Sequence, residues 1–317
     1  MNRTQQILAA VLVVQIILSI ILFWPRTVTT GAGGPLFPDL KTADIVAMTI
    51  VDNEGKSLQL RQVTGNWVLP AADDYPLKAE RITQALDKIV GLNTRRLVAH
   101  TESSHKRLQV ASDNFLVRLD LETAGGAKYS LFLGSSPSYG STHVRLDGRN
   151  ETYLASNLIP WEFSTAPATW IDTSYLSVPK DEVSQITIVN PKGTYTLQKD
   201  AAGTWTLADQ APGEEPTKET VNLIVTRATS VTMVKPLGKQ ERPEYGMDKP
   251  VAVVTLQKGE EIITLHIGAQ DTSDNTYVMK SSTSPYYVRV GDYMVKPLVE
   301  YGRRDLFPPE VTPTPQT

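Results

Sequence analysis

The sequence predicts an α+β protein in which an N-terminal transmembrane helix precedes two duplicated units, each a mostly antiparallel β-sheet with one covering helix. Three observations lead to this prediction. The chain begins with a long uncharged apolar run, one block of sequence occurs twice in the same order, and each copy contains both strand-like and helix-like hydrophobic periods. With 317 residues, 41% hydrophobic and 21% charged, the chain has enough apolar material for two folded units.

The charge balance and the absence of cysteine exclude several functional classes. The net charge is −3, whereas a dedicated nucleic-acid-binding protein needs a large positive surplus, so we expect no nucleic-acid partner. Without cysteine the chain forms no disulfide, thiolate metal site, iron–sulfur cluster or cysteine nucleophile. It also has no cysteine that could carry an N-terminal lipid.

Residues 7–24, from Ile7 to Trp24, carry no charge and are predicted to form a transmembrane anchor within segment 1–24. At about 1.5 Å per residue this helix is about 27 Å long, close to the hydrocarbon thickness of a bilayer. A cleaved signal peptide is the alternative, because residues 30–32 are small. The apolar run is longer than the roughly 7 to 15 residues typical of a signal peptide, which favours a retained anchor.

Charges on the two sides of the anchor are nearly balanced, with Arg3 before it and Arg26 and Lys41 after it. We choose a cytoplasmic N-terminus because an anchor followed by one long exported part is a common design. The expected location is the cell membrane, with a single pass and the C-terminal domains periplasmic or at the cell surface. The absence of cysteine favours a bacterial envelope.

The duplication is visible by comparing residues 48–69 with residues 186–207. Both segments contain Thr-Ile-Val near the start and glycine at two matching positions, and Trp67 matches Trp205 at the same offset. Similarity of this kind at a fixed offset is the signature of a duplicated structural unit.

The similarity continues in the same order with residues 115–134 and 251–268, which end at Gly134 and Gly268. The two units are therefore predicted over 44–178 and 182–307, with the boundary at residues 179–181.

Each unit is predicted to begin with a hairpin and a third strand. In the first unit the hairpin strands are residues 47–51 and 57–62, joined by a turn rich in Asp, Asn and Gly. Trp67 and Trp205 lie on the third strands, and we expect them to be structural anchors that pack each sheet against its helix.

One helix follows the third strand in each unit. Pro76 is expected near the first turn of the first helix, and Thr217 is expected to cap the second. The apolar stripes are Ile82, Leu86, Ile89, Val90 and Leu92 in the first helix, and Val221, Ile224, Val225 and Ala228 in the second.

Two segments are predicted to lie outside the folded units. Residues 25–43 are rich in glycine and proline and are expected to form a flexible stalk. Residues 308–317, PPEVTPTPQT, are expected to be a disordered tail.

The ordered set of motifs resembles the DUF4340 family over nearly all of the chain beyond the anchor. The set comprises the Thr-Ile strand, the Gly-x-Trp step, the helix, the turn Tyr245-Gly246-Met247-Asp248-Lys249-Pro250, the Leu-x-Ile-Gly step and a Tyr-Val strand. The resemblance implies a membrane-anchored bacterial protein, similar to proteins associated with gliding-motility-type ABC transporter auxiliary components, and it implies no catalytic residues. The first copy departs from the turn motif, with residues 106–111 in its place and only Leu108 retained.

Enzyme and metal motifs are not evident, so we predict no catalytic residue, cofactor or metal ligand. Ser103-x-x-Lys106 followed by Ser112 imitates part of a serine acyl-enzyme signature, but no Lys-Thr-Gly follows. His100 and His105 are interpreted as solvated loop residues because two ligands do not hold a catalytic zinc. The oxygen-rich segment 271–275 is interpreted as a hairpin turn rather than a calcium loop.

One local concentration of positive charge follows the first helix. It could be an ordinary solvated face, or it could dock on anionic lipid headgroups or on an acidic partner. The second copy has no equally dense cluster at the matching place. The residues of this basic cluster are Arg95, Arg96, His100, His105, Lys106 and Arg107.

The predicted function is that of a non-enzymatic, membrane-anchored extracytoplasmic binding or scaffold protein, an accessory component of an ABC-transporter-like or envelope complex. Exposed sheet edges would let a partner strand pair with it. The alternatives are an envelope hydrolase that uses paired carboxylates and a cell-wall glycan-binding module. Exposed aromatic residues such as Tyr286 and Tyr287 would serve the glycan-binding alternative, although strand alternation buries at least one of them.

Overall fold

The computed structural model describes residues 33–307, together with Leu12 and Gln15. The predicted tail and nearly all of the predicted membrane anchor lie outside these residues. Among the residues that are described, no helix has both the length and the apolar character needed to cross a bilayer.

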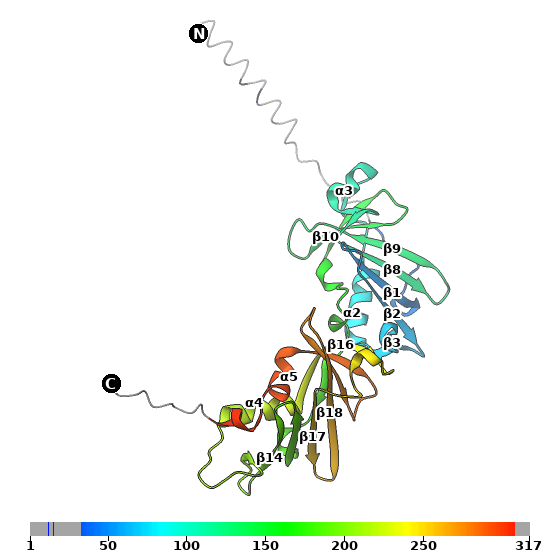
Figure 1. Ribbon diagram of the computed structural model, residues 1–317. Helices are drawn as coiled ribbons and strands as arrows, with labels where there is room; N and C mark the ends of the chain where they lie inside the picture. The colour runs from blue at the N-terminus through cyan, green and yellow to red at the C-terminus, as the bar shows by residue number, and fades with distance from the viewer. Residues whose placement is uncertain (1–11, 13–14, 16–32, 308–317) are drawn as a thin grey trace, which may run out of the picture.

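The protein is α+β, with mostly antiparallel sheets and few helices (Figure 1). The first sheet has the order β4-β3-β2-β1-β8-β9-β10-β11-β5. Its strands are β1 (Ile45–Asp52), β2 (Ser57–Val63), β3 (Asn66–Leu69), β4 (Tyr75–Pro76), β5 (Leu97–Ala99), β8 (Val117–Thr123), β9 (Lys128–Leu133), β10 (Ser141–Leu146) and β11 (Thr152–Ser156). A separate hairpin, β6 (Val110–Ala111) and β7 (Asn114–Phe115), lies beside this sheet.

The second sheet has the order β12-β16-β20-β19-β18-β17-β13-β14-β15. Its strands are β12 (Ser174–Ser177), β13 (Gln185–Asn190), β14 (Gly193–Lys199), β15 (Trp205–Leu207), β16 (Ser230–Gly238), β17 (Ala252–Lys258), β18 (Glu261–Asp271), β19 (Thr276–Ser281) and β20 (Tyr287–Gly291).

Both sheets follow the same connectivity. Read from β3 to β5, the first sheet matches the second read from β15 to β16, strand for strand along the chain. β4 and β12 each add one further strand at opposite ends of this common order. The strands form where inward-facing and outward-facing residues alternate in the sequence. Along β8, every second residue from Val117 to Thr123 is buried.

The two predicted helices are present, and both pack their apolar stripes on a sheet. α2 (Ala79–Val90) buries Ile82, Leu86 and Ile89 in the first core. It begins three residues later than Pro76, because Pro76 pairs with Val68 in the β3–β4 ladder instead of opening the helix. The second helix, α4 (Lys218–Thr229), buries Val221, Ile224, Val225 and Ala228.

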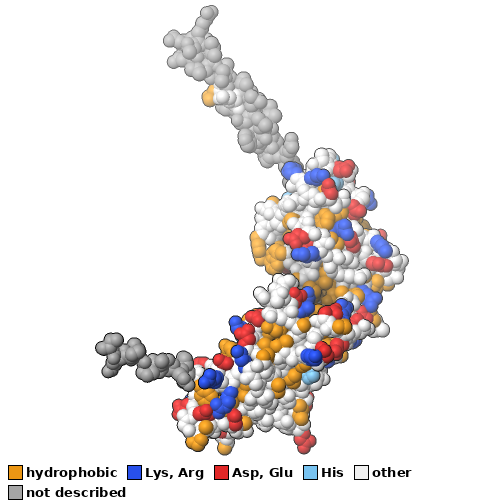
Figure 2. Space-filling view, in the orientation of Figure 1, with side chains coloured by type: hydrophobic (Ala, Val, Ile, Leu, Met, Phe, Trp, Pro, Cys, Tyr) orange, Lys and Arg blue, Asp and Glu red, His pale blue; other side chains and the backbone are white. Residues whose placement is uncertain are grey.

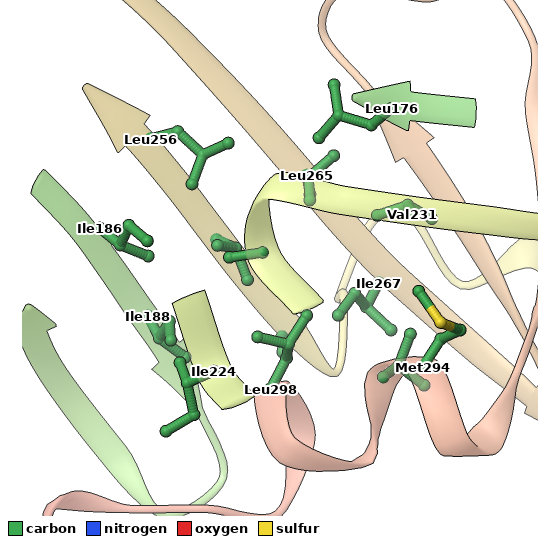
Figure 3. Packing of buried hydrophobic residues seen from close by; sticks show 14 of the residues in the cluster. Leu176, Ile186, Ile188, Ile224, Val231, Leu256, Leu265, Ile267, Met294 and Leu298 are labelled. Carbon is green, nitrogen blue, oxygen red and sulfur yellow. The ribbon is translucent and has the colours of Figure 1, made fainter. Parts of the chain in front are cut away.

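The second unit has an additional helix, α5 (Asp292–Val299), which differs from the prediction of one covering helix in each unit. It packs beside α4 on the second sheet. In Figure 3, Met294 and Leu298 of α5 and Ile224 of α4 lie among strand residues that include Ile188 and Ile267. The helix has eight residues and contains Pro297, a residue that is unfavourable inside a helix, so the sequence pattern did not indicate it.

Residues 33–43 of the predicted stalk pack on the first unit. Leu36, Phe37 and Leu40 are buried in its core, and the backbone N–H of Leu36 donates to the carbonyl of Leu92 at 2.7 Å. The glycines and prolines of this segment indicated flexibility, but the three apolar side chains give it a place in the core.

The chain passes from one core to the other immediately after Trp170. Trp170 is fully buried in the first core, whereas Ile171 and Leu176 are buried in the second. β12 pairs with β16 and so lies in the second sheet, although the repeat comparison assigned residues up to 178 to the first unit. This edge strand has no counterpart in the first copy, which is why the comparison could not place it.

Direct contacts join the two units. The rings of Tyr75 and Tyr286 meet edge-on with centroids 4.7 Å apart, and the Tyr286 hydroxyl donates to the Asp74 carbonyl at 3.2 Å. The backbone N–H of Lys239 donates to Asp73 Oδ2 at 2.6 Å. Tyr286 is therefore used in the contact between the units.

Stability should fall in alkaline solution because of this contact. Burial first, and then the nearby charge of Asp172, raise the pKa of Tyr75 from 10.0 to about 12. A phenol that is harder to ionise in the folded state stabilises the protein fully below pH 10, and this contribution is lost between pH 10 and about 12. We expect the urea midpoint of the full-length protein to fall less across that range in Tyr75→Phe. An equal fall of the urea midpoint with pH in the unmodified protein and in Tyr75→Phe would contradict the prediction.

Candidate functional site

Five residues of the predicted basic cluster remain on the surface, where they surround β5 and α3 (His105–Leu108). Arg95, Arg96, His100 and Arg107 are exposed. Lys106 is also exposed but forms an ion pair with Asp113, with 2.6 Å between Lys106 Nζ and the nearer carboxylate oxygen. Among the described residues Arg95, Arg96 and Arg107 form no ion pair, and these three arginines supply the positive charge of this surface.

His105 is not part of that surface. It is only 5% exposed, and its Nε2 atom lies 2.9 Å from the carbonyl oxygen of Asn150. The prediction of a solvated loop histidine is wrong for this residue. It lies at the start of α3, whose inward face packs Leu108 on the sheet, and this places His105 inside.

The basic surface lies beside the beginning of the described chain. Gly33 packs directly against the backbone of Arg95, and the backbone N–H of Thr94 donates to the Gly34 carbonyl at 3.0 Å. Pro35 forms a β-bridge with Asn93. Figure 2 shows Lys and Arg side chains at this end of the first unit. The continuous described chain therefore begins next to Arg95.

The two repeated tryptophans lie at the margins of their cores. Trp67 on β3 and Trp205 on β15 are only partly buried, and Lys199 Nζ lies 5.3 Å from the centre of the Trp205 ring. Trp170 and Phe163 are instead the largest fully buried side chains of the first unit. The third strand lies at or next to the end of each sheet, which leaves one side of its tryptophan open.

The two repeated glycines have equivalent environments. A Cβ atom at Gly134 would collide with the backbone carbonyl of Leu108, and one at Gly268 would collide with that of Tyr245. The residue after Leu108 is Gln109, with φ 58°, and the residue after Tyr245 is Gly246, with φ 65°. Both adopt the left-handed conformation. The turn that begins at Tyr245 in the second unit is thus also present in the first, where it begins at Leu108.

This turn corrects the register inferred from the sequence. The carbonyl contacts match Leu108 with Tyr245, whereas the sequence comparison placed Lys106 opposite Tyr245. What the units share here is a backbone conformation and a close approach to glycine, while the side chains differ.

An open cleft of about 780 Å³ lies at one end of the first sheet, and the sequence reasoning missed it. Its walls come from the end of β1, the start of β8, the loop between β9 and β10, and the segment that follows β11. The lining residues are Asp52, Asn53, Gln109, Leu116, Val117, Ser135, Ser136, Ser138, Tyr139, Gly140, Ile159, Pro160, Trp161, Phe163, Ser164 and Thr165.

Two aromatic side chains of the cleft are unusually exposed. Tyr139 is 91% exposed and Trp161 is 69% exposed. The backbone that carries Trp161 is nevertheless fixed, because Glu162 forms an ion pair with Lys88 at 2.6 Å and its carbonyl accepts a hydrogen bond from Arg81 at 2.7 Å. The structure therefore holds a large apolar side chain in solvent on a well-anchored turn.

The polar groups of the cleft are mostly neutral. Ser135 Oγ lies 3.1 Å from Nδ1 of His143, a buried histidine on β10, and 3.1 Å from the Leu108 carbonyl. Burial is the main cause that lowers the pKa of His143. Among the hydrogen bonds of the described residues, none joins a carboxylate to His143, so the pair lacks the third group that orients the base in serine hydrolases.

Asp52 is the one carboxylate among the described residues of the lining. Its Oδ2 accepts a hydrogen bond from Thr165 at 2.9 Å, and its Oδ1 accepts the backbone N–H groups of Glu54 and Lys56. Although burial opposes ionisation, these hydrogen bonds lower the pKa of Asp52. The carboxylate is ionised at neutral pH, and both of its oxygens already have partners in the protein.

A family model described as Domain of unknown function (DUF4340) matches residues 67–228, just over half of the chain. The match extends from β3 of the first unit to α4 of the second and includes three walls of the cleft. No curated protein and no solved structure matches the chain.

Proposed function

The chain belongs to the DUF4340 family, and we propose that this member is a membrane-anchored extracytoplasmic binding or scaffold protein, an accessory component of an ABC-transporter-like or envelope complex. In this proposal residues 7–24 are the anchor, and the N-terminus is cytoplasmic. The arginine surface, composed of Arg95, Arg96 and Arg107, faces the membrane and the partner subunits embedded in it.

The observation that carries the proposal is the contact between Gly33 and Arg95. Only eight residues separate Trp24 from Gly33, and a chain of that length spans at most roughly 30 Å. An anchor that ends at Trp24 would thus hold the arginine surface close to the lipid headgroups. Anionic headgroups attract arginines that lie within about a Debye length of the membrane surface.

The proposal predicts specific partners in the membrane. Crosslinking of the tagged full-length protein in cells, followed by solubilisation, affinity purification and mass spectrometry, should recover permease or auxiliary subunits of one complex. The double variant Arg95→Glu, Arg96→Glu should lose most of this recovery, because the reversed charges repel anionic headgroups and acidic partner surfaces.

A matched control keeps the change of charge but moves it to the second unit. Arg242 and Lys249 are both exposed there, and Arg242→Glu with Lys249→Glu should leave the recovered partners unchanged. Recovery of the protein alone, or equal losses in the two double variants, would contradict the proposal.

A further inference from the structure

We infer that the cleft at the end of the first sheet binds a neutral carbohydrate chain, through the faces of Trp161 and Tyr139 and the hydroxyl and amide groups between them. This inference does not depend on the anchor or on the arginine surface.

The size and composition of the cleft are those of a ligand site. Its volume of about 780 Å³ lies within the roughly 300 to 1,000 Å³ typical of such sites, and an apolar floor carries a small number of polar groups. Leu116, Val117 and Phe163 supply the apolar floor. Trp and Tyr are also enriched among the residues that contribute most to binding at protein interfaces.

The charge of the lining selects the class of ligand. Among the described residues that line the cleft there is no Lys, Arg or His, so none of them would neutralise a phosphate, sulfate or carboxylate. The single carboxylate, Asp52, is already engaged by Thr165 and two backbone N–H groups, which also disfavours a strongly cationic ligand. Once anionic and strongly cationic ligands are disfavoured, a neutral ligand is the class that fits the lining.

The available polar groups match the hydroxyls of a sugar. Four serines line the cleft, and each hydroxyl takes part in a hydrogen bond within the protein but keeps further acceptor capacity. Within the described part of the chain no hydrogen bond occupies the side-chain amides of Asn53 and Gln109, which are fully available. Amides and hydroxyls both donate and accept, as sugar hydroxyls require. The C–H faces of a sugar ring are apolar and can cover the exposed faces of Trp161 and Tyr139.

A peptide strand fits the cleft less well. The strands that end there, β1, β8, β9 and β10, are interior strands whose two edges are already paired. An extended peptide could not add to them by main-chain hydrogen bonds, the mode in which sheets bind extended peptides. An apolar peptide would leave its own backbone polar groups without partners in the floor of the cleft.

The second unit has a polar turn at the corresponding place. Its turn between β18 and β19 hydrogen-bonds to itself, with Asp271 accepting from Ser273 and Asp274 accepting from Thr276. At the offset that matches Gly134 with Gly268, Ser273 stands where the first unit has Tyr139. The matching turn of the second unit therefore lacks the aromatic side chain that Tyr139 supplies in the first.

The test is calorimetric titration of the full-length protein, purified in a detergent without a sugar headgroup. The probes are three neutral tetrasaccharides, namely β-1,4-linked N-acetylglucosamine, β-1,4-linked glucose and α-1,4-linked glucose, together with anionic tetragalacturonate and a neutral apolar heptapeptide. We expect at least one neutral tetrasaccharide to bind, and Trp161→Ala and Tyr139→Ala each to weaken its binding by about tenfold or more.

The matched control is Tyr293→Ala, which removes a 62% exposed aromatic side chain from the second unit and should leave the affinity unchanged. Because Trp161 and Tyr139 are both exposed, their replacement should leave the thermal unfolding profile unchanged. The inference is overturned if no neutral tetrasaccharide binds, if only tetragalacturonate or the peptide binds, or if both cleft variants retain the affinity of the unmodified protein.

Discussion

Replacement of Trp170 by alanine is expected to destabilise the first unit by about 4 kcal/mol, because large buried aromatic side chains typically cost about 3 to 5 kcal/mol when truncated. The Trp170 side chain is fully buried. Its Nε1 donates to the Ser164 carbonyl at 2.8 Å, and the Arg81 guanidinium lies 5.3 Å from the centre of its ring. The substitution would leave a cavity, an unpaired carbonyl and a loosened wall of the cleft.

Hydrogen exchange with mass spectrometry measures this effect within one unit of the full-length protein. Protection in α2 and β11 should fall by the same free energy, while α4 and β17 stay protected. Trp161→Ala is the matched control, since it makes the same substitution nine residues away at an exposed site and should change stability by no more than about 0.5 kcal/mol. A loss below about 1 kcal/mol in Trp170→Ala would contradict the assignment of Trp170 to the core.

The regular elements were predictable where the hydrophobic period was long and occurred twice. α2 presents four buried residues and α4 five at helical spacing, and the first hairpin pairs Val51 with Ser57 across the predicted turn. α5 was missed because its eight residues include Pro297, and its burial is supplied by tertiary packing against α4 rather than by a strong local pattern.

The basic surface was predicted in part. Sequence proximity grouped six residues, but whether each side chain points outward depends on the short helix α3, which turns His105 inward while Lys106 and Arg107 stay outside. Four residues provide too little sequence to indicate a helical period, so this orientation could not be inferred.

The cleft could not be predicted because its lining is discontinuous in sequence. Asp52, Gln109, Ser135 and Trp161 come from segments far apart in the chain and meet only where strand ends converge. The one available signal was the presence of Tyr139 and Trp161 in segments rich in Ser, Pro and Gly, where no sheet periodicity accounted for an aromatic residue.

The turn shared by the two units leads to the second prediction. Gly134→Ala and Gly268→Ala should each destabilise their own unit by about 3 kcal/mol. In both cases the added Cβ would meet a backbone carbonyl, that of Leu108 or that of Tyr245, and a carbonyl held in a turn cannot move aside as a flexible side chain can.

The expected loss at Gly134 and Gly268 comes from crowding alone, since neither glycine has positive φ. Gly125→Ala is therefore a control of opposite sign: its Cβ would lie 3.9 Å from Thr123 Oγ1, an ordinary contact. That variant should be stabilised by about 0.4 to 1 kcal/mol, because alanine restricts the unfolded chain. Hydrogen exchange should place the loss in the first unit for Gly134→Ala and in the second for Gly268→Ala. Losses of similar size would mean that the two copies retain one backbone constraint although the residues around it have diverged, whereas a tolerated alanine at either glycine would contradict the close approach in that unit.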